Sequence, residues 1–381
     1  MAFVSKLPHQ EISIFSIMSG LAREQGAINL SQGFPNFDCS PELIQLVDKH
    51  MQAGHNQYAP MPGVPTLREV ISKKIKSLYS VNINPDTEIT ITTGATQAIY
   101  NSIQTIVHPG DEVVIIEPAY DSYVPTIRMC GGIVVPYVLR APNFRVDWEA
   151  FAALISDKTR MVIINTPHNP TATRFSQQDL QQLDKILGDR EDIYLLSDEV
   201  YEHLVYDGEQ HATVLQFPDL YRRSFITYSF GKTFHATGWK MGYCVAPPML
   251  TEEFRKIHQF TVFSVNTPIQ HAIAEYMQTP SNYETLAQFY QQKRDLFLEA
   301  MQGSSLRPLP SAGTYYALFD YSAVSAMKEL DFAKQVTTKH KVATIPVSPF
   351  YTASVENQVL RICFAKKEET LLEAANRLSV L

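Results

Sequence analysis

The 381-residue sequence contains few cysteines, no long apolar run and no recognisable secretion signal. Its four cysteines, Cys39, Cys130, Cys244 and Cys363, form no CxxC pair and have no histidine at metal-ligand spacing. We therefore expect reduced thiols, with neither a disulfide framework nor a metal site. Since no stretch of about 18 apolar residues occurs, we expect no membrane-spanning helix. The N-terminus has no apolar segment followed by a small-residue cleavage site, so we expect a cytoplasmic protein.

Basic charge is not in excess either. The chain has 32 Lys and Arg against 39 Asp and Glu, a formal net charge of −7. A nucleic-acid-binding surface needs a basic face, so nucleic acid is not an expected partner. A local pocket on an acidic protein can still hold a small anion. The length is sufficient for two domains whose cores need no disulfides.

Apolar segments that alternate with helical segments predict an α/β fold. Helices are expected at residues 66–78, at 96–107 and from a Ser176 cap to residue 187. The expected strands are residues 88–92, 112–116, 132–136, 160–165, 193–197, 224–228 and 242–246. Apolar runs without alternation are typical of strands buried on both faces, and helices between them favour a mainly parallel sheet. Functional loops are then expected at the carboxyl ends of these strands.

Three regions are expected along the chain. Residues 1–45 are predicted to form an N-terminal arm and part of a small domain, and the first 40 residues look like arm and loop rather than a packed unit. Residues 46–275 are predicted to form the large domain. Residues 276–381, where helices give way to mixed strands, are predicted to form the small C-terminal domain.

The most informative motif contains Gly231-Lys232-Thr233, directly after the expected strand 224–228. A Walker A loop would require a glycine at position 226, which is Ile226, so that interpretation fails. Taken alone, the motif also fits an exposed loop lysine. Further along the same segment lies Lys240 in Thr237-Gly238-Trp239-Lys240, which alone could be a solvated surface residue.

Four other polar motifs follow expected strands. They are Thr93-Gly94-Ala95-Thr96-Gln97, Pro118-Ala119-Tyr120-Asp121-Ser122-Tyr123, Asn165-Thr166-Pro167-His168-Asn169-Pro170-Thr171 and Ser197-Asp198-Glu199-Val200-Tyr201. The first, at a strand-to-helix junction, can bind an anion with free backbone N–H groups. Each motif also has a structural reading: an ordinary α/β turn, a core tyrosine, a rigid Asn/Pro turn or a helix cap.

In this order the motifs resemble those of the fold-type I, class I/II aminotransferases that depend on pyridoxal 5′-phosphate (PLP). The Gly-Lys-Thr-Phe…Thr-Gly-Trp-Lys version resembles the kynurenine/glutamine transaminase K branch, and within it the bacterial methionine aminotransferases. The resemblance extends from Gln32-Gly33-Phe34-Pro35 to Arg361-Ile362-Cys363-Phe364. It implies an α/β fold of PLP fold type I, with a mainly parallel seven-stranded sheet flanked by helices and a smaller α+β domain.

The resemblance assigns the catalytic residues. It implies that Lys232 carries PLP as a Schiff base, that Asp198 binds the pyridine nitrogen and that Tyr201 and Asn169 lie beside the phenolic oxygen. Tyr120 is expected to stack on the cofactor ring. The chemistry agrees, because a lysine near other cations and partly desolvated loses its proton more easily, and a carboxylate stabilises a protonated ring nitrogen.

The resemblance also assigns the phosphate site. Gly94, Ala95 and Thr96 are expected to cup the phosphate with backbone amides, and Ser229 to add a hydroxyl. Most relatives have arginine where this chain has Lys240, so a point charge replaces a bidentate fork. The family also usually has glycine at the position of Ala172, with little expected consequence because the functional asparagine lies upstream.

The resemblance implies that Arg361 and the backbone N–H of Gly33 bind the substrate α-carboxylate, and Asn169, Phe15 and Phe263 are further expected substrate-binding residues. Tyr58 resembles the tyrosine that reaches the phosphate of a neighbouring subunit, which implies a homodimer with shared active sites. A surface salt bridge for Arg361 and a loop aromatic for Tyr58 remain the structural alternatives. Aromatic and apolar side chains suggest a large apolar substrate pocket; they are Ile14, Phe15, Tyr58, Phe263 and Phe350.

The expected reaction is transamination between an amino acid and a 2-oxo acid. The apolar pocket favours methionine, with phenylalanine, tyrosine, glutamine and kynurenine as further donors, because a flexible thioether fits such a wall. One alternative is a PLP-dependent cysteine-conjugate β-lyase. A PLP-binding regulator without turnover is a third class, disfavoured by the acidic charge and the lack of a DNA-binding module.

Overall fold

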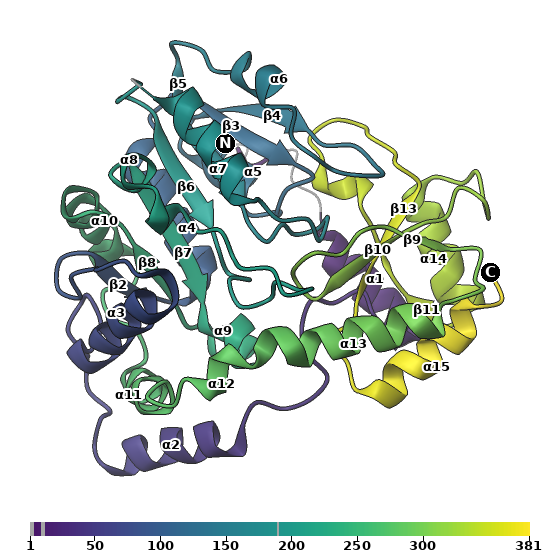
Figure 1. Ribbon diagram of the computed structural model, residues 1–381, viewed down its shortest axis with the longest axis horizontal. Helices are drawn as coiled ribbons and strands as arrows, with labels where there is room; N and C mark the ends of the chain where they lie inside the picture. Colours follow the sequence, from purple (N-terminus) through teal and green to yellow (C-terminus); the bar gives the residue numbers. More distant parts are fainter. Residues whose placement is uncertain (1–3, 9–11, 189) are drawn as a thin grey trace.

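The computed structural model describes residues 4–8, 12–188 and 190–381, and its larger part is built on a seven-stranded sheet (Figure 1). The sheet order is β2-β8-β7-β6-β5-β3-β4. The strands are β2 (Ile89–Thr92), β3 (Glu112–Glu117), β4 (Ile133–Val138), β5 (Thr159–Asn165), β6 (Tyr194–Asp198), β7 (Ser224–Ser229) and β8 (Gly242–Val245). Only β8 runs antiparallel to its neighbours in this sheet, so the predicted mainly parallel sheet of seven strands is confirmed.

Apolar side chains cover both faces of this sheet. Val113 and Ile115 of β3 point into one core and Val114 and Ile116 into the other, because successive strand residues face opposite sides. Helices α4 (Gly94–Ile106), α5 (Tyr123–Met129) and α10 (Pro248–Thr261) cover the first face. Helices α3 (Pro65–Tyr79), α6 (Trp148–Ala152), α7 (Gln177–Leu187) and α8 (Pro218–Tyr221) cover the second.

The predicted helix start at Ser176 is confirmed in detail. The hydroxyl of Ser176 accepts from the backbone N–H of Asp179, and the Asp179 carboxylate accepts from the backbone N–H of Ser176. This reciprocal capping satisfies two backbone donors at the start of α7.

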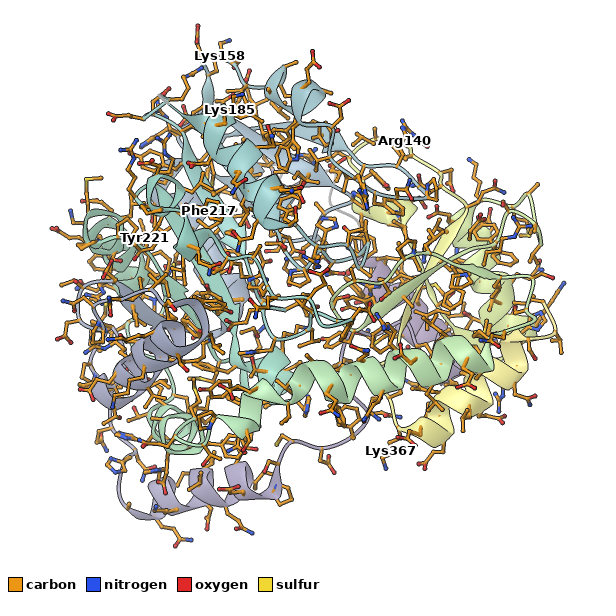
Figure 2. The ribbon with its side chains drawn as sticks, viewed as in Figure 1. Arg140, Lys158, Lys185, Phe217, Tyr221 and Lys367 are labelled. Atoms are coloured by element: carbon orange, nitrogen blue, oxygen red, sulfur yellow. The ribbon has the colours of Figure 1, made fainter. Side chains whose placement is uncertain are left out.

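Figure 2 shows charged side chains such as Arg140, Lys158 and Lys367 at the rim of the molecule, where they are exposed.

The smaller part contains a four-stranded sheet of order β12-β13-β10-β9 and a two-stranded sheet β1-β11. Its strands are β1 (Ile28–Asn29), β9 (Arg307–Pro308), β10 (Tyr316–Asp320), β11 (Val342–Ala343), β12 (Ile345–Pro346) and β13 (Val359–Cys363). Its helices are α1 (Ile14–Glu24), α14 (Glu329–Lys339) and α15 (Glu368–Leu378). The parallel pairing of β1 with β11 joins the N-terminal segment to the C-terminal part.

The remaining helices connect the two parts or pack against the large part. They are α2 (Pro41–Gln52), α9 (Phe230–Thr233), α11 (Thr267–Tyr276), α12 (Ser281–Glu284) and α13 (Leu286–Ala300), with short 3₁₀ turns at Val214–Gln216, Thr237–Trp239 and Ser348–Phe350. Helix α13 runs from α12 beside the large part to the small part, where it packs on α15 (Figure 1). Within the described residues, no helix combines the length and apolarity that crossing a bilayer requires.

The N-terminal segment differs from its expected form as arm and loop. Residues 14–24 form the packed helix α1, because Ile14, Met18 and Ala22 recur at four-residue spacing and are all buried. The four cysteine thiols are free, as predicted. The domain boundaries near residues 45 and 275 stay predictions.

A buried ion pair between Lys74 and Glu202 anchors the loop that follows β6. Glu202 accepts a hydrogen bond from Lys74 of α3 and another, 2.7 Å long, from the Tyr79 hydroxyl. Burial alone would raise the pKa of Glu202, but the neighbouring Lys74 ammonium and these hydrogen bonds bring it down to about 2. The pair therefore fixes the segment that follows Asp198 against helix α3.

Replacing Glu202 by glutamine should destabilise the fold strongly. The change leaves the Lys74 ammonium buried without its counter-charge, which costs about 3–5 kcal/mol in comparable cases. Urea unfolding of the two proteins at neutral pH measures the difference. Glu373→Gln is the matched control, because Glu373 pairs with Arg377 on the surface and should cost under about 1 kcal/mol. Equal losses in the two variants would contradict the assigned role of the buried pair.

Candidate active site

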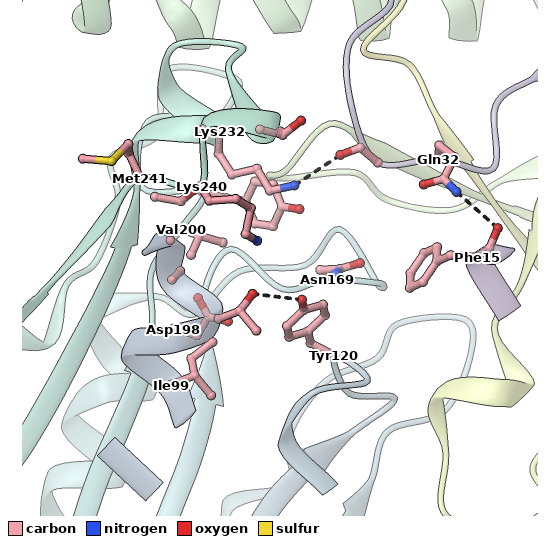
Figure 3. Close-up of a pocket in the computed structure, with 18 of the residues that line it drawn as sticks. Phe15, Gln32, Ile99, Tyr120, Asn169, Asp198, Val200, Lys232, Lys240 and Met241 are labelled. Atoms are coloured by element: carbon pink, nitrogen blue, oxygen red, sulfur yellow. Dashed lines mark hydrogen bonds between the residues drawn. The ribbon is translucent and has the colours of Figure 1, made fainter. Parts of the chain in front are cut away.

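A cavity of about 220 Å³ lies where β5, β6 and β7 end and α4 begins (Figure 3). It is lined by Phe15, Gln32, Gly33, Gly94, Ala95, Thr96, Ile99, Tyr120, Asn169, Asp198, Val200, Tyr201, Ser229, Gly231, Lys232, Thr237, Lys240, Met241 and Tyr316. The fold thus brings together most of the candidate site residues, which come from five strand-end motifs and, for Phe15 and Gly33, from the N-terminal segment. Parallel strands account for this, since their carboxyl ends meet at one edge of the sheet.

Lys232 follows β7 on the short helix α9 and points across the cavity (Figure 3). Its ammonium donates to the Gly33 carbonyl at 3.2 Å and to the Tyr315 hydroxyl at 2.7 Å. The rings of Tyr201 and Tyr315 lie 5.6 and 5.3 Å from the same nitrogen. The amine is therefore fixed in position by neutral partners, and no carboxylate within the described residues lies close enough to form an ion pair with it.

The pKa of Lys232 is lowered to about 8. Burial is the main cause, because desolvation disfavours the charged amine, and the positive charges of Arg361 and Lys240 act in the same direction. An amine with this pKa is partly unprotonated near neutral pH. It can therefore attack a carbonyl and take up or release a proton, whereas an ordinary exposed lysine would stay protonated.

Asp198 is the last residue of β6 and lines the cavity. Its carboxylate accepts from the Tyr123 hydroxyl at 2.5 Å and from the Thr227 hydroxyl at 3.5 Å. Burial raises the pKa of Asp198 to about 6, and these hydrogen bonds together with the Lys232 charge limit the rise. Such a carboxylate is suited to share a proton with a basic ring nitrogen.

The start of α4 offers an anion site. The first backbone N–H groups of a helix lack internal partners, and here they belong to Gly94, Ala95 and Thr96. Gly94 adopts a φ of +74°, and a Cβ added there would lie 3.6 Å from Nζ of Lys240. The Lys240 ammonium therefore lies beside the helix N-terminus, and Ser229 lines the same end of the cavity.

Asn169 and Tyr120 complete the walls. A hydrogen bond of 2.7 Å joins the backbone N–H of Asn169 to the Asn165 side chain, which in turn donates to the Asp198 carbonyl. The Tyr120 hydroxyl lies 3.3 Å from that of Thr96 (Figure 3). In the turn after Asn169, buried Ala172 adopts a φ of +59°, a conformation that glycine adopts without strain.

Arg361 on β13 is fully buried and lies behind the cavity wall. Its guanidinium donates to Asn169 at 2.6 Å and to the Ser31 carbonyl at 3.2 Å, and it stacks on Tyr316 at 3.9 Å. Its Nε has no partner, and no carboxylate within the described residues pairs with it. A buried cation without a direct ion pair can bind an anionic ligand, because a carboxylate can take up its free donor.

The N-terminal helix closes one side of the cavity. Phe15 of α1 lies 5.3 Å from the Arg361 guanidinium and 5.6 Å from the Phe350 ring. The Gln32 amide donates to the Phe15 carbonyl at 3.2 Å (Figure 3). Gly33 must be glycine at this point, because a Cβ would lie 1.9 Å from the Tyr316 hydroxyl.

Five of the candidate residues do not line the cavity: Arg361 lies behind its wall, Ile14 and Phe350 are buried, and Tyr58 and Phe263 lie on the surface. Tyr58 is 84% exposed and Phe263 44% exposed, and their rings contact each other at 5.6 Å on the surface. Neither lines the cavity within a single chain. Their roles, at a neighbouring subunit's phosphate and in the substrate pocket, stay predictions.

Sequence reasoning missed several residues that the structure places in or against the cavity; they are Gln32, Ile99, Tyr123, Thr237, Met241, Tyr315 and Tyr316. Tyr123 stands in the motif quoted for Tyr120, so a second aromatic after β3 was a usable signal. Tyr315 and Tyr316 had none, because they come from β10 and the turn before it, far from the motifs along the chain.

The site combines a half-buried lysine of lowered pKa with a carboxylate, an anion site and a buried unpaired arginine. Such a set of groups is typical of an enzyme that acts on the carbonyl and amine groups of anionic ligands. The comparisons with known proteins place it more narrowly. Residues 25–378 match the family model described as aminotransferase class I and II. The chain belongs to this family and is an aminotransferase.

Individual relatives cover the whole chain. It is 49% identical to the methionine aminotransferase of Escherichia coli strain K12, over 99% of this chain and 98% of that protein. It is 32% identical to the kynurenine–oxoglutarate transaminase of Dictyostelium discoideum, over 96% and 93%. Among solved structures, YbdL from Escherichia coli, reported with a methionine aminotransferase function, matches with a TM-score of 0.98, 48% identity and complete coverage of both chains. The predicted family and fold are confirmed.

Class I and II aminotransferases depend on PLP in general. The cavity residues fit such a cofactor: the α4 N-terminus with Lys240 could hold a phosphate, the carboxylate of Asp198 could hold a ring nitrogen, and the Lys232 amine could bond to an aldehyde. Where most relatives are expected to have arginine, this chain has Lys240, whose ammonium lies beside the N-terminus of α4.

The uptake of PLP by the cofactor-free protein should rise with pH, with a midpoint near 8, and level off roughly one to two pH units higher. Only the unprotonated Lys232 amine attacks an aldehyde, and the unprotonated fraction grows as pH passes the pKa of about 8. The initial rate of uptake, followed by visible absorbance, gives the profile. In Arg361→Met the profile should move to higher pH, because removing a nearby cation raises the pKa of Lys232. A midpoint near 10.5 in both proteins would contradict the assignment.

Proposed function

We propose that this aminotransferase holds PLP on Lys232 and transfers the amino group of an apolar, sulfur-containing or aromatic L-amino acid to a 2-oxo acid, with methionine as the favoured donor. The observation that carries the proposal is the half-buried Lys232 amine, whose pKa is lowered to about 8 within reach of Asp198 and Arg361. When bound, PLP supplies an aldehyde for the amino group and an electron-accepting ring.

The chain's own residues would divide the work. Gly94, Ala95 and Thr96 would bind the phosphate with backbone N–H groups, supported by Ser229 and Lys240. Asp198, held by Tyr123, would keep the ring nitrogen protonated, and Tyr201 and Asn169 would hydrogen-bond the phenolic oxygen. Tyr120 would pack on the ring.

Arg361, Asn169 and Gly33 would bind and orient the substrate carboxylate. Arg361 is suited to this because its guanidinium is buried and lacks an ionic partner among the described residues. Lys232, freed from the cofactor by the incoming amine, would take the proton from the substrate Cα and return it to the cofactor carbon. Its nearby partners, the Tyr315 hydroxyl and the Gly33 carbonyl, hold the amine in position for both transfers.

The walls favour an uncharged side chain. Among the described residues that line the cavity, Phe15, Ile99, Val200 and Met241 are apolar and none is an arginine, and Arg361, behind the wall, is assigned to the substrate α-carboxylate. A donor with a second carboxylate, such as aspartate, would have no guanidinium to pair with there. A flexible thioether can fit an irregular apolar wall, which supports methionine. The 49% identity to a methionine aminotransferase supports the same choice.

We also propose a homodimer that shares its active sites, in the cytoplasm. The exposed Tyr58, packed on Phe263 outside the cavity of its own chain, is free to reach a neighbouring subunit's phosphate, and Phe263 to reach its substrate pocket. The β-lyase alternative would use the same deprotonation by Lys232, but no comparison supports it. A regulator without turnover is disfavoured, because the match to the aminotransferase family and the 49% identity to a methionine aminotransferase support turnover.

Replacing Lys232 by alanine should abolish transamination. The loss of the proton-transferring amine alone costs roughly 10²–10⁴-fold in rate, and the covalent link is lost as well. The assay is methionine-dependent amination of a 2-oxo acid at saturating PLP. Lys158→Ala is the matched control, because Lys158 is exposed on the rim of the large part and should leave the rate unchanged. Full activity of Lys232→Ala without added amines would sink the proposal.

A panel of amino donors tests the substrate class. Methionine, phenylalanine, tyrosine, glutamine and kynurenine should each convert PLP to its amine form faster than aspartate does, because only aspartate brings a second carboxylate for which no arginine lines the cavity. Single-turnover absorbance changes with purified holoenzyme give the rates. If aspartate reacted best, the proposed pocket would be wrong while transamination itself would stand.

A further inference from the structure

Three histidines from distant parts of the sequence meet on the face of the large part farthest from β4. His50 lies near the end of α2, His55 in the turn that follows, and His271 on α11. Helices α2 and α11 pack side by side at the bottom of Figure 1. One ring nitrogen of each histidine lies within 4.8 Å of the other two. None of the three residues lines the active-site cavity.

The three imidazole rings lie in close contact. His55 and His271 have ring centroids 4.0 Å apart, and His50 stacks on His271 at 5.3 Å with an interplanar angle of 27°. Three imidazoles in contact offer several nitrogen lone pairs to one small volume. Nitrogens around a tetrahedral Zn²⁺ at about 2.0–2.1 Å lie about 3.4 Å apart. The three ring nitrogens, all within 4.8 Å of one another, lie somewhat beyond that spacing.

A carboxylate orients one of the rings. Glu275, one turn after His271 on α11, lies 3.1 Å from Nε2 of His50 and also accepts from Lys49 at 2.6 Å. An Nε2–H that donates to Glu275 leaves the lone pair of His50 on Nδ1, which is buried and has no partner. Histidines that bind metals are commonly held by a carboxylate on the other ring nitrogen in this way. This arrangement leaves Nδ1 of His50, which has no hydrogen-bond partner among the described residues, next to the imidazoles of His55 and His271.

We propose that His50, His55 and His271 form a binding site for a divalent transition metal of the Zn²⁺ type, with water in the fourth position. Imidazole ligands suit Zn²⁺, Cu²⁺ and Ni²⁺, whereas Mg²⁺ and Ca²⁺ prefer oxygen. The sequence spacing predicted no metal site, because His271 is brought to the other two only by the packing of α11 on α2.

The metal would act on structure rather than on the reaction. It would tie the end of α2 and the following turn to α11, adjacent to existing contacts: Thr267 donates to the Gln57 carbonyl at 2.6 Å and Ser264 to the Ala59 carbonyl at 2.9 Å. The segment between Gln57 and Ala59 carries Tyr58. Metal binding should therefore raise thermal stability and order this segment without being required for amino transfer.

Zn²⁺ titration of chelator-treated holoenzyme by calorimetry tests the proposal. Wild type should take up one tightly bound Zn²⁺ per chain and gain thermal stability. His55→Gln and His271→Gln should each weaken binding by at least about tenfold, and Glu275→Gln should weaken it by roughly 10–100-fold through loss of ring orientation. His108→Gln is the matched control, since His108 is exposed and outside the cluster.

Replacement of Zn²⁺ by Co²⁺ adds a readout of the ligands. Wild type should give the intense visible absorption of four-coordinate Co²⁺ with nitrogen ligands, and the His55→Gln, His271→Gln double variant should not. The proposal is overturned if wild type binds no Zn²⁺, or if the double variant binds it with the same affinity and stoichiometry as His108→Gln. Retained PLP absorbance in each variant shows that the fold is intact.

Discussion

The structure depends on keeping one amine out of water beside other positive charges. Burial of Lys232, with Arg361 and Lys240 nearby, lowers its pKa to about 8 and turns an ordinary lysine into a nucleophile and proton carrier. Holding the amine there without a carboxylate partner requires neutral acceptors, and the Gly33 carbonyl and Tyr315 hydroxyl supply them. An ion pair at Lys232 would have raised its pKa and removed this reactivity.

The rest of the site follows from the same requirement. Each cation that lowers the pKa of Lys232 also presents a positive charge to an anionic ligand: Lys240 beside the α4 N-terminus, and Arg361 behind Asn169. Asp198 lies within the same cavity but is held by Tyr123 and Thr227 rather than by Lys232. Lys232, Lys240 and Asp198 thus line one cavity of about 220 Å³ with Arg361 behind its wall, so a zwitterionic ligand and a phosphorylated cofactor can meet groups of both signs there.

Most of this arrangement was predictable from the sequence, because the relevant residues follow apolar strands. Motifs at the ends of β5, β6 and β7 must meet at one edge of a parallel sheet, so the amino-acid pattern alone places Asn169, Asp198 and Lys232 close together. The sequence did not predict the site residues that come from other parts of the fold. Tyr315 and Tyr316 reach the cavity from the small part, and helix α1 packs through only three buried positions, a pattern too short to distinguish from a loop.

Peptide mapping after borohydride reduction of the PLP-loaded protein tests the central claim most directly. If the half-buried, partly unprotonated amine at position 232 is the group that bonds to the cofactor, mass spectrometry should find the reduced adduct on the peptide that contains Lys232 and on no other lysine. An adduct at Lys240 or at surface lysines, or no adduct at all, would contradict the account.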